Sequence, residues 1–290
     1  MMRKSVYVFL SCFLLSGCGM IDYHPYDVRI SGETEVNAHN IERIEANCQG
    51  KTTIRFVTMG DSQRWYDETE DFVKEINKRN DIDFVIHGGD MSDFGLTKEF
   101  LWQRDIMNGL NVPYVTLIGN HDCLGTGAET YKAVFGPTNF SFIAGNVKFV
   151  CLNTNALEYD YSEPVPNFTF MEQEITSRLD EFEKTVISMH ARPYTDVFND
   201  NVAKVFQHYI RQYPGIQVCT AAHTHHYQDD VIFDDGIHYV TSDCMDYRTY
   251  LVFTITPEKY EYELVKYLLY LARRSIIRTS VTSRSDFSYL

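Results

Sequence analysis

Six side chains that can bind a metal ion follow short apolar runs of this 290-residue sequence. Three are oxygen donors that come directly after a glycine, and three are histidines that follow later runs. They are Asp61, Asp90, Asn120, His190, His223 and His225. Carboxylate, amide and imidazole ligands together suit Mn²⁺, Fe or Zn²⁺ better than a thiolate-seeking metal or an all-oxygen Ca²⁺ site. The pattern predicts a metal site if these positions meet in the fold.

Each of these residues alone has a commoner structural interpretation. Asp61 and Asp90 alone would be turn residues after glycine, and Asn120 a turn residue with left-handed backbone. His190 alone would be a strand-end histidine held by a backbone hydrogen bond. Five placements at strand ends change the interpretation, because residues just past the carboxyl ends of strands in an α/β sheet share one crevice. We therefore predict that the five loops converge.

The apolar runs are typical of strands that are buried on both faces. They cover residues 53–59, 84–87, 114–118, 147–152, 185–189 and 216–220. Amphipathic helical patterns lie between most of them and cover residues 68–78, 98–107, 171–182 and 202–211. This alternation predicts a layered α/β fold. Later runs without clear intervening helices predict added antiparallel strands near one edge, at residues 231–233, 238–241, 249–255 and 260–265.

In their order along the chain, these motifs resemble those of the calcineurin-like metallophosphoesterases. The matching motifs are Asp61-x-Gln63, Gly89-Asp90, Gly119-Asn120-His121-Asp122, His190 and His223-x-His225. A Gly-Asp pair alone carries little information, but the four-residue block followed by a strand-end histidine and a His-x-His pair is specific. The resemblance covers roughly residues 54–255. It implies an α/β fold, a layered β-sandwich of two mixed sheets flanked by helices.

The resemblance also implies two divalent metal ions, with Asp90 bridging them. The first ion would be bound by Asp61, Asp90 and His225, and the second by Asp90, Asn120, His190 and His223. Many family members have a histidine where this chain has Gln63, and a glutamine offers only a neutral carbonyl oxygen. We therefore expect weaker or more exchangeable occupancy of the first site.

The implied activity is metal-dependent hydrolysis of phosphoric esters, with monoesters and diesters both left open. A bridging hydroxide at the dinuclear centre would attack phosphorus. His121 would protonate the leaving oxygen or stabilise charge on the phosphate, and Asp122 would orient His121. Two alternatives stay open. One is a non-catalytic phosphate- or nucleotide-binding surface protein whose first site is degenerate at Gln63, and the other is a structural lipoprotein whose histidines bind no metal.

The formal net charge of −14, from 40 acidic and 26 basic side chains, argues against a polyanionic partner. No run of Lys and Arg offers the counterion release that binding to duplex nucleic acid requires. A small phosphorylated substrate is still compatible, because two bound divalent cations would make one cleft locally positive. We expect such a substrate and no duplex nucleic acid.

The N-terminus resembles a bacterial lipoprotein signal. Arg3 and Lys4 precede an apolar stretch over residues 6–15 that is too short to span a bilayer. The sequence Leu-Ser-Gly-Cys18 resembles a lipobox, in which the chain is cleaved before the cysteine and the cysteine carries the lipid. Glycine rather than aspartate follows, so we expect an exported protein anchored in the outer membrane of the bacterial envelope. An ordinary secretory peptide with an incidental cysteine is the alternative.

We divide the chain into four predicted segments. They are a signal peptide over residues 1–17, a tether or peripheral segment over 18–50, the metallophosphoesterase domain over 51–267, and a peripheral helix with a loose tail over 268–290. Five cysteines follow Cys18, and an odd number in an exported protein argues against a complete disulfide framework.

Overall fold

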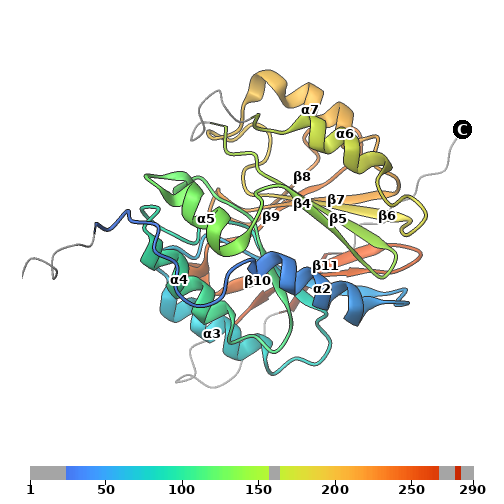
Figure 1. The fold of residues 1–290 in the computed structure, drawn as a ribbon. Coiled ribbons are helices and arrows are strands. Elements are labelled where there is room, and N and C mark those ends of the chain that lie inside the picture. The colour runs from blue at the N-terminus through green and yellow to red at the C-terminus, as the bar shows by residue number, and fades with distance from the viewer. Residues whose placement is uncertain (1–23, 157–163, 268–277, 282–290) are drawn as a thin grey trace, which may run out of the picture.

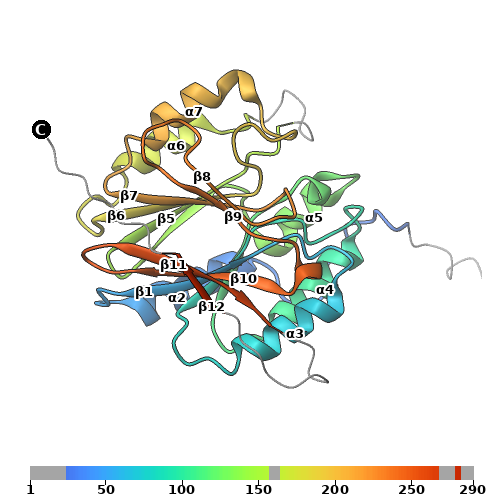
Figure 2. The same cartoon turned by 180° about the vertical axis from the view of Figure 1, so that it is seen from behind.

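The computed structural model describes residues 24–156 and 164–267 with their side chains, and residues 278–281 as backbone only. Two six-stranded sheets pack against each other, and six α-helices of the described residues lie around them (Figure 1 and Figure 2). This confirms the predicted α/β sandwich of two mixed sheets. Within the described ranges, none of the helices combines the length and the apolar character needed to cross a membrane.

The first sheet has the strand order β12-β11-β10-β1-β2-β3. Its strands are β1 (Ile54–Met59), β2 (Phe84–His87), β3 (Tyr114–Thr116), β10 (Thr249–Ile255), β11 (Tyr260–Lys266) and β12 (Arg278–Val281). β1, β2 and β3 run parallel, whereas β10 is antiparallel to β1, β11 to β10 and β12 to β11. The three parallel strands therefore direct their carboxyl ends to one edge of the sheet.

The second sheet has the order β4-β5-β6-β7-β9-β8. Its strands are β4 (Phe140–Ala144), β5 (Val147–Leu152), β6 (Lys184–Met189), β7 (Ile216–Ala221), β8 (Gln228–Asp230) and β9 (Tyr239–Thr241). The four central strands are parallel, and β4 and β8 pair antiparallel at the two edges. Short antiparallel edges around a parallel centre are common in mixed sheets.

The helices form the outer layers. Their bounds are α2 (Val36–Cys48), α3 (Tyr66–Ile76), α4 (Thr97–Met107), α5 (Gly127–Phe135), α6 (Phe168–Thr176) and α7 (Ala203–Ile210). α3 and α4 cover the first sheet, and α6 and α7 cover the second (Figure 1). The described part of the chain also contains three short 3₁₀ helices, at His121–Cys123, Asp200–Val202 and Met245–Tyr247.

Aromatic side chains fill the interface between the two sheets. Phe56 of β1 stacks on Phe84 and Phe253 of its own sheet, with ring centroids 5.6 and 5.1 Å apart. Phe149 of β5 meets Phe56 edge to face at 4.9 Å. The next β1 side chain, Val57, belongs instead to the cluster beneath α3 and α4. Both faces of β1 are buried, which explains its continuous apolar run.

The second half of the segment over residues 18–50, predicted as a tether or peripheral segment, contains helix α2. Val36, Ile44 and Cys48 of α2 are fully buried. Asn37 pairs with the backbone of Thr116 on edge strand β3, donating to its carbonyl at 3.0 Å and accepting from its N–H at 2.9 Å. α2 therefore covers the open edge of the first sheet. Two of its five buried residues are asparagines, so its buried face is not marked by apolar residues alone in the sequence.

The late strands also differ from the sequence prediction. β9 pairs parallel with β7 in the second sheet, whereas β10 and β11 extend the first sheet, so the late runs do not share one edge. Residues 231–233 lie outside any strand, and residues 278–281 form β12 rather than a loose tail. The predicted signal peptide, Cys18 and the rest of the predicted C-terminal segment lie outside the described residues.

Candidate metal centre

The predicted ligands meet where the carboxyl ends of the parallel strands of both sheets come together. Loops after β1, β2 and β3 carry the oxygen donors, and loops after β6 and β7 carry the histidines. The backbone N–H of Ala222 donates to the carbonyl of His190 at 2.9 Å, and His190 Nδ1 lies 2.8 Å from the carbonyl oxygen of Gly88. A carbonyl only accepts, so Nδ1 carries the hydrogen and Nε2 is free to bind a metal.

One group of ligands is enclosed. Ligand atoms of Asp90, His190 and His223 all lie within 4.8 Å of one another. The Oδ1 atom of Asn120 lies 3.0 Å from His190 Nε2 and 2.9 Å from His223 Nδ1. His190 Nε2 is 3.4 Å from Asp90 Oδ2, and both side chains are buried. These four residues are the set that the resemblance implies for the second ion, and we call them the inner group.

A second group shares Asp90. Ligand atoms of Asp61, Asp90 and His225 also lie within 4.8 Å of one another, with His225 Nε2 3.5 Å from Asp61 Oδ1. The side chain of His225 is 44% exposed. Gln63 is buried beside them, with Nε2 3.5 Å from Asp90 Oδ2. We call these four residues the outer group.

The outer group contains two buried oxygen atoms without hydrogen-bond partners. They are Oδ1 of Asp61 and Oε1 of Gln63. A buried carboxylate oxygen that makes no hydrogen bond is destabilising unless a cation compensates it. Burial is the largest cause of the raised pKa of Asp61, which is about 7; the Asp90 carboxylate also raises it, whereas His190 lowers it. The donor types, their spacing and these two unpartnered atoms all fit a bound divalent cation.

Four of the candidate ligands have strained backbone conformations. The φ angles of Asp61, Asp90, His223 and His225 are 50°, 56°, 74° and 62°, in the left-handed region that residues other than glycine seldom adopt. Such conformations cost about 1–3 kcal/mol each and tend to gather at functional sites. The cluster indicates that side-chain placement here outweighs backbone preference.

Gly119 allows the β2 and β3 loops to approach. A Cβ atom at this position would lie 2.1 Å from Asp90 Oδ1 and 2.2 Å from the Asp90 backbone nitrogen. Any side chain would therefore displace the shared carboxylate. This explains physically why glycine precedes Asn120.

His190 and Asp90 form a charged pair when no metal is bound. Burial lowers the pKa of His190, but the adjacent Asp90 carboxylate outweighs that effect and raises it to about 9. Burial raises the pKa of Asp90, and His190 more than reverses this, so the net direction is downward. A metal ion must therefore displace a proton from His190.

His121 lies at the rim of the site. Its backbone N–H donates to Asp90 Oδ1 at 2.9 Å, and its ring Nδ1 lies 3.0 Å from the carbonyl oxygen of Asp93. Burial lowers the pKa of His121, but the Asp93 carbonyl and the carboxylates of Asp90 and Asp93 together raise it. The carboxylate of Asp93 also pairs with Arg64.

Asp122 has contacts other than those that the sequence predicts. Its Oδ1 accepts from the backbone N–H groups of Met91 and Ser92 at 2.9 and 2.8 Å, and from the Ser92 hydroxyl at 3.0 Å. Its Oδ2 accepts from the N–H of Gly119 at 2.9 Å. The carboxylate thus joins the β2 and β3 loops, while the His121 ring is oriented by Asp93.

A cavity of about 280 Å³ opens beside the outer group. It is lined by Gln63, Arg64, Trp65, His121, His225, His226, Cys244, Asp246 and Tyr247. His226 was not expected here, because its offset from the His-x-His pair suggested a loop role. It packs against Tyr247, with ring centroids 5.4 Å apart. Proximity of a third histidine to the motif was the only sequence signal.

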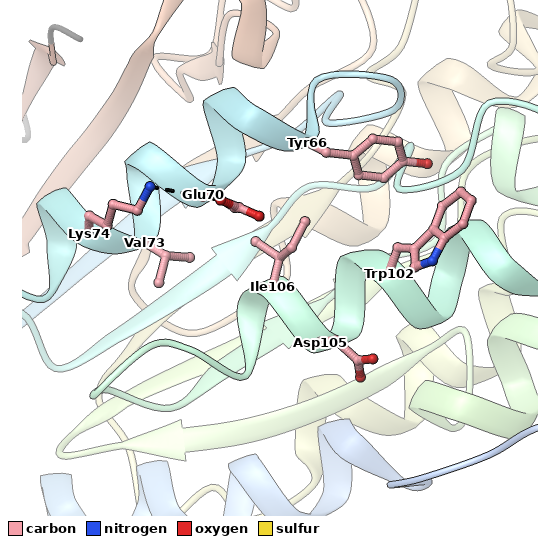
Figure 3. Close-up of a pocket in the computed structure, with 7 residues that line it drawn as sticks. All are labelled: Tyr66, Glu70, Val73, Lys74, Trp102, Asp105 and Ile106. Carbon is pink, nitrogen blue, oxygen red and sulfur yellow. Dashed lines mark ion pairs between the residues drawn. The ribbon is translucent and has the colours of Figure 1, made fainter. Parts of the chain in front are cut away.

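The larger cavity drawn in Figure 3 lies away from the ligands. It has a volume of about 550 Å³ and lies between α3 and α4. Tyr66 and Trp102 approach each other at one end, with ring centroids 5.7 Å apart and nearly perpendicular planes. None of the described residues that line it is a candidate ligand. The smaller cavity is therefore the one that adjoins the metal centre.

Solved structures share this fold at low sequence identity. A purple acid phosphatase from yellow lupin (Lupinus luteus) seeds aligns with a TM-score of 0.56 at 15% identity, over 75% of this chain and 52% of that one. A dimetal phosphatase from Danio rerio aligns with a TM-score of 0.52 at 11% identity, over 73% of this chain and 95% of that one. GAP50, the anchor in the inner membrane complex of Plasmodium, aligns with a TM-score of 0.57 at 11% identity, over 81% of this chain and 91% of that one. The chain thus spans about half the length of the lupin protein and most of the other two.

Comparison of sequences is consistent with the fold. No curated protein sequence matches the chain. A sequence model of the calcineurin-like phosphoesterases matches residues 54–227, which is more than half of the 290 residues. The match begins at the first residue of β1 and ends two residues beyond His225, so it contains every candidate ligand. The chain therefore belongs to the calcineurin-like phosphoesterase family.

Proposed function

We propose that this chain hydrolyses phosphoric esters at a centre of two divalent metal ions. The observation that supports this most strongly is the shared carboxylate of Asp90, which lies within 4.8 Å of the ligand atoms of both groups. The inner group would hold one ion, and Asp61, Asp90 and His225 would hold the other. Mn, Fe or Zn suits this mixture of oxygen and imidazole donors.

When bound, the two ions would neutralise charge on the phosphoryl oxygens and make a water molecule nucleophilic near neutral pH. The side chains of the chain fix where this happens. His190 is oriented by the Gly88 carbonyl, and the backbone N–H of His223 donates to Asp61 Oδ2 at 3.0 Å. The hydrogen bond between His223 and Asp61 joins the two groups, so the loop after β7 would position both.

His121 is the proposed acid for the leaving group. Because Nδ1 faces the Asp93 carbonyl, which only accepts, Nδ1 keeps its hydrogen and Nε2 holds the proton that can be transferred. The raised pKa of His121 keeps that proton in place nearer to neutral pH. As the bond from phosphorus to the leaving oxygen breaks, that oxygen would take the proton from Nε2.

The substrate would be a small phosphorylated molecule whose leaving group enters the adjoining cavity. Trp65, His226 and Tyr247 offer ring faces or edges there, and Arg64 stands at its wall paired with Asp93. Arg192, two residues after His190, and Arg248, one residue after Tyr247, pair with carboxylates that do not line this cavity. Arg192 pairs with Asp230, and Arg248 pairs with Glu68 and Asp71. Monoesters and diesters are both compatible with this cavity.

Release of p-nitrophenolate from p-nitrophenyl phosphate and bis-p-nitrophenyl phosphate, with and without Mn²⁺, tests the proposal. We expect metal-dependent turnover of at least one ester, lost in Asp90→Asn and reduced in His121→Ala, since p-nitrophenolate is an acidic leaving group that needs its proton less. The matched control is His39→Ala, which removes an exposed histidine of α2. Phosphate binding without metal-dependent turnover would contradict the enzyme and favour the non-catalytic surface protein with a degenerate first site.

We also propose that Cys18 carries a lipid that anchors the protein in the bacterial envelope, in the outer membrane. The support is the lipobox-like sequence before Cys18 together with the basic and apolar residues ahead of it. The mass of the mature N-terminal peptide checks this. We expect a lipid-modified Cys18 that disappears in Cys18→Ser, and an unmodified N-terminus at another residue would contradict it.

A further inference from the structure

The loop that follows His190 places the exposed carboxylate of Asp196 beside the inner group. Asp196 Oδ1 lies 2.6 Å from His223 Nε2, while Nδ1 of the same ring lies 2.9 Å from Asn120 Oδ1. The side chain of Asp196 is 85% exposed and that of His223 is 10% exposed. The ring therefore lies between the two side chains, with Nε2 toward Asp196 and Nδ1 toward the inner group.

This contact determines which ring nitrogen of His223 carries the hydrogen. Both neighbours of the ring only accept, and the charged carboxylate is the stronger acceptor, so in the neutral ring Nε2 donates to Asp196 and Nδ1 presents its lone pair toward the inner group. Only a nitrogen with a free lone pair can bind a metal ion. A carboxylate on the far nitrogen of a ligating histidine fixes both the tautomer and the orientation of the ring.

The loop that carries Asp196 is fixed despite the exposure of its side chain. The two following residues, Val197 and Phe198, are buried. The N–H of Phe198 donates to the carbonyl of Thr195 at 3.1 Å, and the N–H of Tyr194 donates to Asp200 Oδ1 at 2.9 Å. Asp196 thus stands at the tip of a closed turn. An exposed ion pair on a loose loop would contribute little, but this carboxylate is already positioned.

We propose that Asp196 is a positioning residue for the metal ion of the inner group. It holds His223 in the tautomer that offers Nδ1 to the ion, and it prevents the ring from rotating away. The proposal rests on the proposed metal centre. It differs from a stabilising role, because its effect is on ring tautomer and metal affinity rather than on folding.

Three variants separate these roles. Asp196→Ala removes the acceptor, and Asp196→Asn keeps a side-chain carbonyl that can accept from Nε2. Asp230→Ala is the matched control, because Asp230 is an exposed carboxylate whose partner is Arg192 rather than a ligand. Thermal unfolding of each variant shows whether the fold is kept.

The first measurement is the ¹⁵N spectrum of the histidine rings in metal-free protein, with the His223 signals assigned by their loss in His223→Gln. We expect the Nε2–H tautomer in the wild type, in Asp196→Asn and in Asp230→Ala, and a mixture of tautomers in Asp196→Ala. An unchanged tautomer in Asp196→Ala would overturn the proposal. This readout needs neither metal nor turnover, so it decides the role of Asp196 even if the proposed activity is wrong.

The second measurement is stepwise Mn²⁺ binding by calorimetry. We expect one of the two binding steps to weaken by about 10- to 100-fold in Asp196→Ala, as for other residues that orient metal-binding histidines. Asp196→Asn should recover most of the loss. Equal weakening in Asp230→Ala, or wild-type binding in Asp196→Ala, would overturn the proposal. Tight Mn²⁺ binding without ester hydrolysis would contradict the proposed function and leave this inference supported.

Discussion

The inner and outer groups share Asp90 but differ in how firmly their other ligands are held. In the inner group His190 is fully buried and its ring is tied to the Gly88 carbonyl. In the outer group the His225 side chain is 44% exposed, and the buried carbonyl oxygen of Gln63 has no hydrogen-bond partner. The ligands of the inner group are held in place by their surroundings, whereas the outer group is open toward the cavity.

This difference suggests a division of labour. A closed site with oriented ligands retains its ion, and an open site beside a cavity can exchange its ion and meet a substrate. His121 and the 280 Å³ cavity both lie on the open side. Gln63 stands where many family members have a histidine, and it belongs to the outer group. This is the group that, lying beside the cavity, has less need to bind its ion firmly.

The strongest test of the comparison removes what the groups share. Asp90→Asn takes away the negative charge that both ions would use. We expect metal content to fall for both sites and ester hydrolysis to drop by about a thousandfold or more, since metal charge supplies several kcal/mol of stabilisation. Elemental analysis and steady-state rates measure the two effects. Retention of both ions in Asp90→Asn would contradict a shared ligand.

The next largest effect on the rate should come from a change on the side of the site that is open to the cavity. His121→Ala removes the proposed proton donor without removing a ligand. We expect the rate to fall by about a hundredfold or more while metal content stays at the wild-type level. The loss should be smaller for an ester whose leaving group is already acidic. A loss of metal equal to the loss of rate would instead make His121 a ligand.

The metal affinities of the two groups should fall in different pH ranges. Metal binding requires unprotonated ligands, so affinity falls as pH falls through the pKa of the metal-free group. The pKa of about 9 at His190 predicts about tenfold weaker binding to the inner group for each unit below pH 9. The pKa of about 7 at Asp61 predicts that the outer group weakens only below pH 7. Calorimetry at pH 6, 7 and 8 checks this, and pH-independent binding at both steps would contradict it.

The smallest expected effect restores the residue that many family members have. Gln63→His supplies an imidazole to the outer group in place of a neutral carbonyl oxygen. We expect the weaker Mn²⁺ binding step to tighten by about tenfold, or about 1.4 kcal/mol, and the stronger step to stay unchanged. Gln63→Ala is the control and should not tighten either step. A change confined to the stronger step would reverse the assignment of the groups.

The sequence predicts which candidate ligands come together better than it predicts their surroundings, for physical reasons. A ligand must have a particular chemical type at a strand end, and both can be found in the sequence. The partner of His121 depends on where a loop carbonyl lies, so the sequence pointed to the adjacent Asp122 where the structure has Asp93. His226 enters the cavity through the path of a loop, and no residue pattern records that path.

The fold shows the same division. Strands buried on both faces were found from their apolar runs, and β2, β5 and β10 have the predicted bounds. α2 was not predicted because two of its five buried residues are asparagines, and β9 was given the wrong pairing because an apolar run does not specify its sheet. Burial determines the local pattern of apolar residues, whereas the strand that pairs with a given strand is determined by contacts between residues far apart in the sequence.

The most direct test is the anomalous X-ray scattering of a crystal of the full chain soaked in Mn²⁺. We expect two peaks on either side of Asp90, one among Asn120, His190 and His223 and the other near Asp61 and His225. The second peak should be weaker and should be lost first on washing with chelator. Two ions at other positions, or a protein that binds none at saturating Mn²⁺, would contradict a dinuclear centre built on Asp90.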